Sequence, residues 1–181
     1  MEWYLYKKDD FSQNNFNRCI ELMTSERKAK ILAKNPHSQY MSVFGEWVAK
    51  SHIADTLNIP IEKITILHSS LGKPYADGID IKFSISHSGN YLAVAFDKNE
   101  IGIDIEQIRH IDIKITKKVC TESDLLHIKE NNELQSFFEI WTAKEAYFKK
   151  MGTGITSLKS ICYKDIDVIH HYKDGCVISI V

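Results

Sequence analysis

The stretch that decides the fold reads Ile101-Gly102-Ile103-Asp104-Ile105-Glu106, in which apolar and acidic side chains alternate. In a β-strand, residues two apart point to the same side, so the isoleucines would face a core while Asp104 and Glu106 lie together on the other face. Two adjacent carboxylates repel each other, and Mg²⁺ relieves that repulsion by accepting their oxygens. The alternative is a half-exposed strand with two solvated acids. The hexapeptide alone leaves both interpretations open.

Further strand-like segments precede this stretch. β-Branched and aromatic residues, separated by turn residues, predict strands at 64–67, 81–86 and 91–96. Together with residues 101–105, we expect these segments to form an antiparallel meander.

The other elements follow from periodicity and from helix start and stop signals. They are a strand at 3–6, helices at 25–32, 38–57, 121–129 and 134–151, and strands within 161–181 joined by a turn at Asp174-Gly175. Pro36 ends the first of these helices and residues 58–60 end the second. This order predicts an α+β protein of two halves, the second smaller, with a joint near 104–112.

Composition excludes several classes of protein. The chain has 181 residues, of which 23 are Lys or Arg and 24 are Asp or Glu, so a net charge of −1 argues against a nucleic-acid-binding protein. The four cysteines form no CxxC pair, and the N-terminus has no apolar stretch typical of a signal peptide. No apolar run approaches the roughly 20 residues of a membrane helix. We therefore expect a cytoplasmic protein with no membrane contact.

A second group of charged residues lies within the predicted helix at 134–151. Glu145 and Lys149 are four residues apart and are neighbours on one helical face, a spacing that usually gives a surface ion pair. However, this helix is hydrophobic around much of its circumference, so Lys144, Glu145 and Lys149 cannot all lie on a wide solvated face. Charges near a buried face need a partner, such as a metal ion or a phosphate.

Two shorter motifs carry polar groups near turns. Residues 83–89 contain a Ser-His-Ser run, which forms either a hydrogen-bonded turn or a set of short donors for a phosphate. Gly72-Lys73-Pro74 places a lysine in a rigid turn, for which a plain loop is the simpler interpretation. No GxSxG motif occurs in the chain, which argues against a serine hydrolase.

Taken in order, these motifs resemble those of the 4′-phosphopantetheinyl transferases. The motifs are 72–74, 83–88, 102–106, Thr121-Glu122 and 141–149, and the resemblance spans about residues 20–160. It is closer to the larger, pseudo-dimeric type that serves nonribosomal peptide and polyketide synthetases than to the short trimeric synthases. It implies two pseudo-symmetric α+β halves, each a helix packed on a small, mainly antiparallel sheet. We place the coenzyme A side with the first metal ligand at 1–104, and the catalytic helix, in a shortened second half, at 105–181.

The resemblance also implies an activity and a metal site. Such enzymes transfer the phosphopantetheine arm of coenzyme A to a serine hydroxyl of an apo carrier protein and release adenosine 3′,5′-bisphosphate. Asp104, Glu106 and Glu145 would hold Mg²⁺ against the pyrophosphate, and Lys149 would stabilise the leaving group. Either Glu145 or Glu122 would take the serine proton, and the sequence does not separate base from ligand.

Other matched positions imply coenzyme A contacts and a partner. Coenzyme A would be bound by Arg27, Lys30, Lys73, Pro74, Ser86 and His87, together with Lys149. An apo acyl or peptidyl carrier domain, acidic beside its serine, would dock near residues 110–130, where Lys114, Lys117 and Lys118 are positive; an exposed basic stretch without a partner is the alternative.

We expect a cytoplasmic monomer that acts in nonribosomal peptide, polyketide or fatty acid biosynthesis. The alternatives are a catalytically inactive coenzyme A-binding protein and a partner-binding α+β module.

Overall fold

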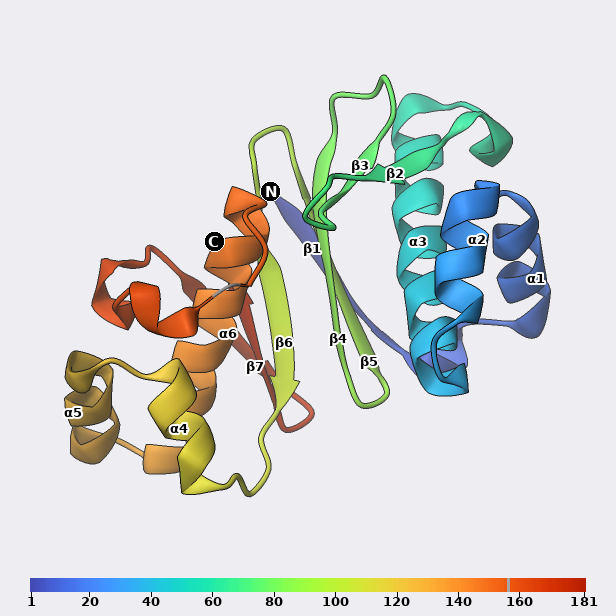
Figure 1. The fold of residues 1–181 in the computed structure, drawn as a ribbon. Helices are drawn as coiled ribbons and strands as arrows, with labels where there is room; N and C mark the ends of the chain where they lie inside the picture. Colours follow the sequence, from blue (N-terminus) through green and yellow to red (C-terminus); the bar gives the residue numbers. More distant parts are fainter. Residues whose placement is uncertain (156) are drawn as a thin grey trace.

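The protein consists of four layers. The computed structural model describes residues 1–155 and 157–181, and of Ile113 only the backbone. From one side to the other in Figure 1, the layers are a group of helices, a three-stranded sheet, a second three-stranded sheet and a second group of helices. All strand pairs within these sheets are antiparallel. The predicted α+β class with small antiparallel sheets is confirmed.

The first two layers, called here the N-terminal layers, come from the first part of the chain. They comprise β1 (Glu2–Lys7), α1 (Gln13–Glu21), α2 (Ser25–Leu32), α3 (Pro36–Leu57), β2 (Ile66–His68), β3 (Pro74–Ala76), β4 (Lys82–Ser88) and β5 (Tyr91–Asp97). The C-terminal layers comprise β6 (Ile103–Gln107), α4 (Ile113–Val119), α5 (Glu122–Glu130), α6 (Glu133–Met151), β7 (Ile169–Lys173) and β8 (Cys176–Ile180). The sheet orders are β1-β5-β4 and β6-β8-β7, and β2 pairs with β3.

Capping residues fix the ends of the helices that the sequence predicts. The Thr24 side chain accepts a hydrogen bond from the Arg27 backbone at the start of α2, and Asn35 caps α3. Pro36 is the first residue of α3, since a missing N–H costs nothing at that position. Asn58 ends α3 in a left-handed conformation. Among the described residues, no helix is both long and apolar enough to cross a membrane.

Strand β5 is buried on both faces and joins the N-terminal layers to the second sheet. Leu92, Val94 and Phe96 belong to the core shared with α3. Ala93 and Ala95 point the other way, into a core with residues of β6 and β8. That second core comprises Ala93, Ala95, Ile101, Ile103, Ile105, Cys176, Ile178 and Ile180. Small alanines on this face let the two sheets approach closely.

The predicted meander is wrong outside β4 and β5. β2 pairs with β3, and β6 pairs with β8 rather than with β5. Gly102 and Val181 also exchange two backbone hydrogen bonds beside this pair. The partner of β6 lies about seventy residues further along the chain, and strand periodicity carries no information about so distant a pairing. The division at residues 104 and 105 stays a prediction, and that boundary falls within β6.

Candidate active site

Three serines of β4 hold β6 beside the first sheet. Ser84 Oγ accepts from the Ile103 N–H at 3.1 Å, and Ser88 Oγ accepts from the Gln107 N–H at 3.2 Å. Between them, Ser86 Oγ donates to Asp104 Oδ1 at 2.6 Å. Serines at every second position share one face of β4, so the strand presents a row of hydroxyls to β6.

Asp104 is the centre of the site and is almost fully buried, with 2% of its surface exposed. Its Oδ1 accepts hydrogen bonds from Ser86 and from Lys149 Nζ, both at 2.6 Å. Its Oδ2 is the one buried side-chain polar atom of the described residues without a hydrogen-bond partner. Burial raises the pKa of Asp104, while Lys149 and Ser86 act in the opposite direction. A buried carboxylate oxygen without a donor calls for a further positive or donating group.

Two more carboxylates flank Asp104. Glu145 Oε1 accepts from Trp141 Nε1 at 2.6 Å. Burial, and next the charge of Asp104, raise the pKa of Glu145 to about 7. Glu106 Oε2 accepts from Ser88 Oγ at 2.9 Å and from the Arg109 guanidinium at 2.6 Å.

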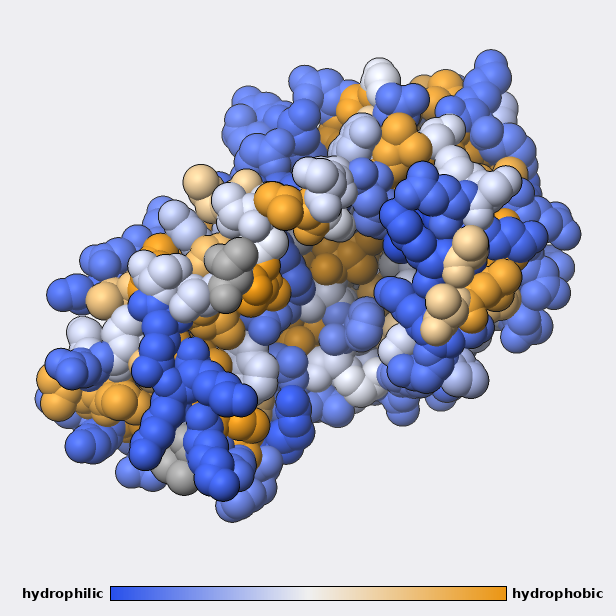
Figure 2. All heavy atoms as spheres, in the orientation of Figure 1, coloured by the Kyte–Doolittle hydropathy of each residue, from blue (hydrophilic) through white to orange (hydrophobic). Residues whose placement is uncertain are grey.

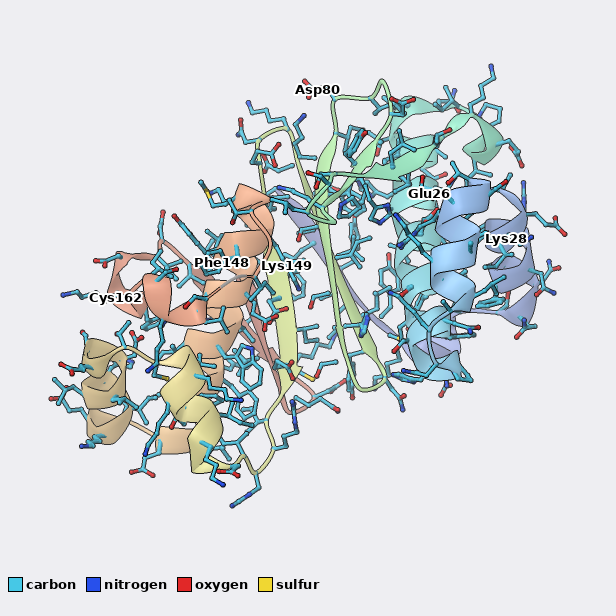
Figure 3. The ribbon with its side chains drawn as sticks, viewed as in Figure 1. Glu26, Lys28, Asp80, Phe148, Lys149 and Cys162 are labelled. Carbon is cyan, nitrogen blue, oxygen red and sulfur yellow. The ribbon has the colours of Figure 1, made fainter. Side chains whose placement is uncertain are left out.

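The position of α6 depends on a close approach to β6. A Cβ atom on Gly102 would lie 1.8 Å from the carbonyl oxygen of Ala146, so only glycine fits there. Figure 3 shows Lys149 on the side of α6 that faces β6 and the N-terminal layers. Gly152 ends the helix with a φ of 65°. This packing brings Glu145 and Lys149 to the carboxylates of β6.

Lys144 faces away from this cluster and forms a buried ion pair. Its Nζ donates to Asp124 Oδ2 at 2.6 Å and to the Val119 carbonyl at 2.9 Å. The side chains of Lys144 and Asp124 are 0% and 2% exposed. The prediction that the charges of this helix do not share one solvated face is confirmed.

The carboxylates of Asp104, Glu106 and Glu145 could bind a divalent cation, but they do not form a complete set of metal ligands. Within residues 1–155 and 157–181, no group of three His, Cys, Asp or Glu side chains is arranged to hold a metal ion. However, Asp104 Oδ2 is free of donors, and burial, followed by the charge of Asp104, raises the pKa of Glu145. A cation held by one or two carboxylates, with its other ligands from a phosphate or water, fits this donor set.

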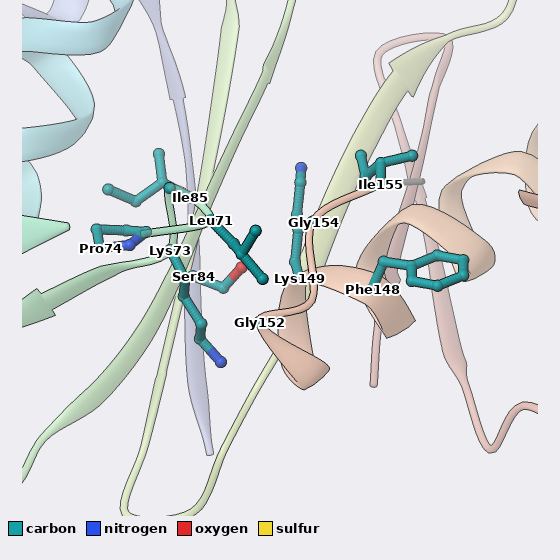
Figure 4. A pocket seen from close by; sticks show the side chains of 11 residues that line it. Leu71, Lys73, Pro74, Ser84, Ile85, Phe148, Lys149, Gly152, Gly154 and Ile155 are labelled. Carbon is teal, nitrogen blue, oxygen red and sulfur yellow. The ribbon is translucent and has the colours of Figure 1, made fainter. Parts of the chain in front are cut away.

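Two cavities meet beside the cluster, where Figure 2 shows the surface hollowed. One, of about 300 Å³, is lined by Lys73, Pro74, Ser84 and Lys149, among others (Figure 4). The other, of about 360 Å³, is lined by Arg27, Lys30 and Glu26, together with uncharged residues. Gly72 lines both, so they are adjacent.

The second cavity has the electrostatics of an anion site. Arg27 Nε donates to the buried carboxylate of Glu46 at 3.0 Å, which orients the guanidinium. His68 lies in the same cavity, and burial, followed by the charges of Arg27 and Lys30, lowers its pKa to about 4. Arg27 and Lys30 are already paired with Glu46 and Glu26, so a binding anion would share these two cations with the carboxylates.

The structure brings most of the predicted residues together, but not all. Ser86, Asp104 and Lys149 are hydrogen-bonded in one cluster. His87 lies on β4, and partial desolvation, followed by the charge of Lys149, lowers its pKa. Glu122 lies exposed at the first position of α5, and no hydrogen bond within the described residues joins it to this cluster.

Sequence reasoning missed several residues that shape the site. The Trp141 bond to Glu145 spans four residues of a helix, a spacing that could have revealed it. Ser84 and Ser88 alternate with Ser86, which was predicted, so their place on the same face of the strand was equally visible. Glu46 as the partner of Arg27 had no local signal, because the two residues lie on different helices.

Comparison with known proteins agrees with this geometry. Residues 100–179 match the family model described as 4′-phosphopantetheinyl transferase superfamily. The chain is 34% identical over 151 residues to the 4′-phosphopantetheinyl transferase gsp of Aneurinibacillus migulanus, covering 81% of this chain and 63% of that protein. It is 27% identical over 157 residues to the 4′-phosphopantetheinyl transferase Sfp of Bacillus subtilis, covering 84% and 70%. The chain thus spans less than two thirds of the first relative's length. The resemblance inferred from the motifs is confirmed.

Proposed function

Because this chain belongs to the 4′-phosphopantetheinyl transferase superfamily, we propose that it transfers 4′-phosphopantetheine from coenzyme A to a serine hydroxyl of an apo carrier protein. The observation that carries this proposal is the convergence of Asp104, Glu145 and Lys149 beside the cavity lined by Lys73 and Pro74. Buried acids next to a lysine and a basic cavity suit the transfer of a group between phosphate and hydroxyl oxygens.

We assign the metal ligands to Asp104, Glu106 and Glu145. Mg²⁺ bound there would neutralise charge on the pyrophosphate during transfer. Asp104 Oδ2 supports this assignment, since it is buried and has no donor. Glu106 is already bonded to Ser88 and Arg109, so its role would require Arg109 to move aside or to share the carboxylate.

The transfer would proceed by attack of the carrier serine oxygen on the phosphorus of the phosphopantetheine group. A new P–O bond forms to the serine, the bond to the bridging oxygen breaks, and adenosine 3′,5′-bisphosphate leaves with that oxygen. Glu145 is one candidate to take the serine proton, directly or through a water molecule, because it lies buried beside Asp104 and Lys149. This role is an alternative to its role as a metal ligand, since a bound cation would lower its pKa. Glu122 remains the alternative base. Because its side chain is exposed, the bound carrier would have to place its serine hydroxyl next to Glu122. Lys149 would stabilise the developing negative charge.

Coenzyme A would lie across the two cavities. Arg27 and Lys30 would meet its phosphates in the basic cavity. Ser86 and His87 of β4 would contact phosphate oxygens near Lys149. Pro74 would border the nucleotide, in the cavity wall that Lys73 also forms.

The carrier domain would dock on α4 and the start of α5. Lys117 and Lys118 lie in the last turn of α4, with Lys114 one turn earlier, and together they would attract an acidic partner. We further propose that the protein acts as a cytoplasmic monomer serving nonribosomal peptide, polyketide or fatty acid synthesis.

Mass spectrometry of an apo carrier domain tests the activity. After incubation with the protein, coenzyme A and Mg²⁺, the carrier should gain the mass of phosphopantetheine. Asp104→Asn should abolish this gain without unfolding the protein, whereas Asp80→Asn, at an exposed surface acid, should leave it unchanged. If the wild-type protein binds coenzyme A but the carrier gains no mass, the result would instead support an inactive coenzyme A-binding protein. If the protein neither binds coenzyme A nor modifies the carrier, the result would support a partner-binding module.

A further inference from the structure

Lys73 connects the N-terminal layers to the end of the catalytic helix. Its ammonium donates to the carbonyl oxygen of Lys150 at 2.7 Å and pairs with Glu100. Only 18% of its side chain is exposed. The ammonium is therefore engaged with the protein itself.

The turn that carries Lys73 is well fixed. The Ser69 N–H donates to the Lys73 carbonyl at 2.9 Å, and Ser69 Oγ accepts from the Lys73 N–H at 3.1 Å. Gly72, with a φ of 91°, provides the left-handed conformation that this turn needs. The ammonium thus extends from a defined position between β2 and β3.

The other end of the contact is the last turn of α6. The Gly152 N–H bonds to the carbonyls of Phe148 and Lys149. The Lys150 carbonyl takes its hydrogen bond from Lys73, and a cation at a helix C-terminus is favourable. A Cβ on Gly152 would lie 3.2 Å from Lys73 Cδ, so the two segments are in close contact. Figure 4 shows Lys73 and Gly152 in facing walls of one cavity.

We propose that Lys73 is a positioning residue that holds the end of α6 so that Lys149 meets the reacting phosphate. Lys149 immediately precedes Lys150, and its Nζ lies 2.6 Å from Asp104 Oδ1. Fixing the Lys150 carbonyl limits the movement of Lys149. The inference rests on the proposed transfer reaction, and it gives Lys73 a role different from binding coenzyme A directly.

Steady-state kinetics of Lys73→Met and Lys73→Arg separate the two roles. If Lys73 is a positioning residue, Lys73→Met should lower kcat roughly tenfold or more, while KM for coenzyme A stays within about twofold of the wild-type value. Lys73→Arg should recover most of kcat, because a guanidinium also donates to a carbonyl. Lys82→Met removes another lysine, one that pairs with Asp80 and has no hydrogen bond to α6 among the described residues, and it should match the wild type. A raised KM with unchanged kcat, or no change in either constant, would overturn the proposal.

Hydrogen exchange gives a readout that does not depend on activity. Lys73→Met should speed exchange of the amides near Gly152, and Lys82→Met should not. If the wild type transfers nothing, the proposed function fails, and this exchange comparison alone decides whether Lys73 holds α6. If the amides near Gly152 exchange equally fast in both variants, Lys73 does not fix the end of α6.

Discussion

The buried ion pair between Lys144 and Asp124 predicts a large loss of stability for Lys144→Met. Methionine preserves most of the volume but removes the charge and two hydrogen bonds, and it leaves the Asp124 carboxylate buried. Breaking a buried pair by removing one partner costs about 3–5 kcal/mol. In a protein of this size, that corresponds to a melting temperature roughly 6–20 °C lower. Urea unfolding followed by tryptophan fluorescence would measure the free energy directly.

A matched control is Lys30→Met. Lys30 and Glu26 are also 2.6 Å apart, but their side chains are 66% and 79% exposed. Exposed pairs at this helical spacing contribute little to stability, because water screens both charges. The reasoning is refuted if the two variants lose similar free energies. Adding Asp124→Asn to Lys144→Met should recover part of the loss, since the remaining buried charge disappears.

The effect of pH on this pair has a defined sign. Burial alone would raise the pKa of Asp124, but the hydrogen bonds from Lys144, Thr121 and Tyr163 lower it overall. The stabilisation is therefore present above the ordinary pKa of aspartate and is lost as pH falls through the lowered value. The difference between wild type and Lys144→Met should accordingly shrink in acid.

Two further predictions concern the carboxylate cluster and the packing of α6. Because the pKa of Glu145 is raised to about 7, its favourable contribution to stability is complete below its ordinary value of 4.5 and is lost as pH rises through about 7. In scanning fluorimetry, Mg²⁺ should raise the melting temperature more at about pH 8 than at about pH 5. Asp104→Asn should remove this difference. An equal shift of the melting temperature at both pH values would contradict a role for Glu145 at the cation. Gly102→Ala should cost about 3 kcal/mol or more in urea unfolding, because its Cβ would overlap the Ala146 carbonyl. Gly175→Ala, with open space around the Cβ and only a positive φ, should cost about 1–2 kcal/mol, and equal losses would exclude the overlap as the cause.

Local signals in the sequence predicted the elements well where caps and periodicity act within a few residues. Helix α3 is one case, since it ends at Leu57 as predicted and Asn58 follows in a left-handed conformation. Pro36, interpreted from the sequence as the end of the preceding helix, is instead the first residue of α3. The hairpin of β7 and β8 turns at Asp174-Gly175 for the same reason. The pairing of β6 with β8 had no such signal, because it depends on residues far apart in the sequence.

The site shows the same distinction. Asp104, Glu106, Glu145 and Lys149 could be identified because strand and helix spacing place them on definite faces. The burial of Asp104 could not be predicted, because it results from the packing of β4, β6 and α6 against one another. Lys73 is a related case: its motif suggested a turn, while its bond to Lys150 depends on the packing of two distant segments.

The serine row of β4 has a mechanical consequence for the whole molecule. β4 and β6 are neighbours, yet the bonds recorded between them run through the hydroxyls of Ser84, Ser86 and Ser88 rather than through a backbone ladder. These hydroxyls are buried, and the same two sheets also share the apolar core that Ala93 and Ala95 form with β6 and β8. Separating the sheets would expose that core and leave the buried polar groups without their partners, which is costly. The two sheets are thus joined through side chains, and the carboxylates of Asp104 and Glu106 are themselves part of that joint.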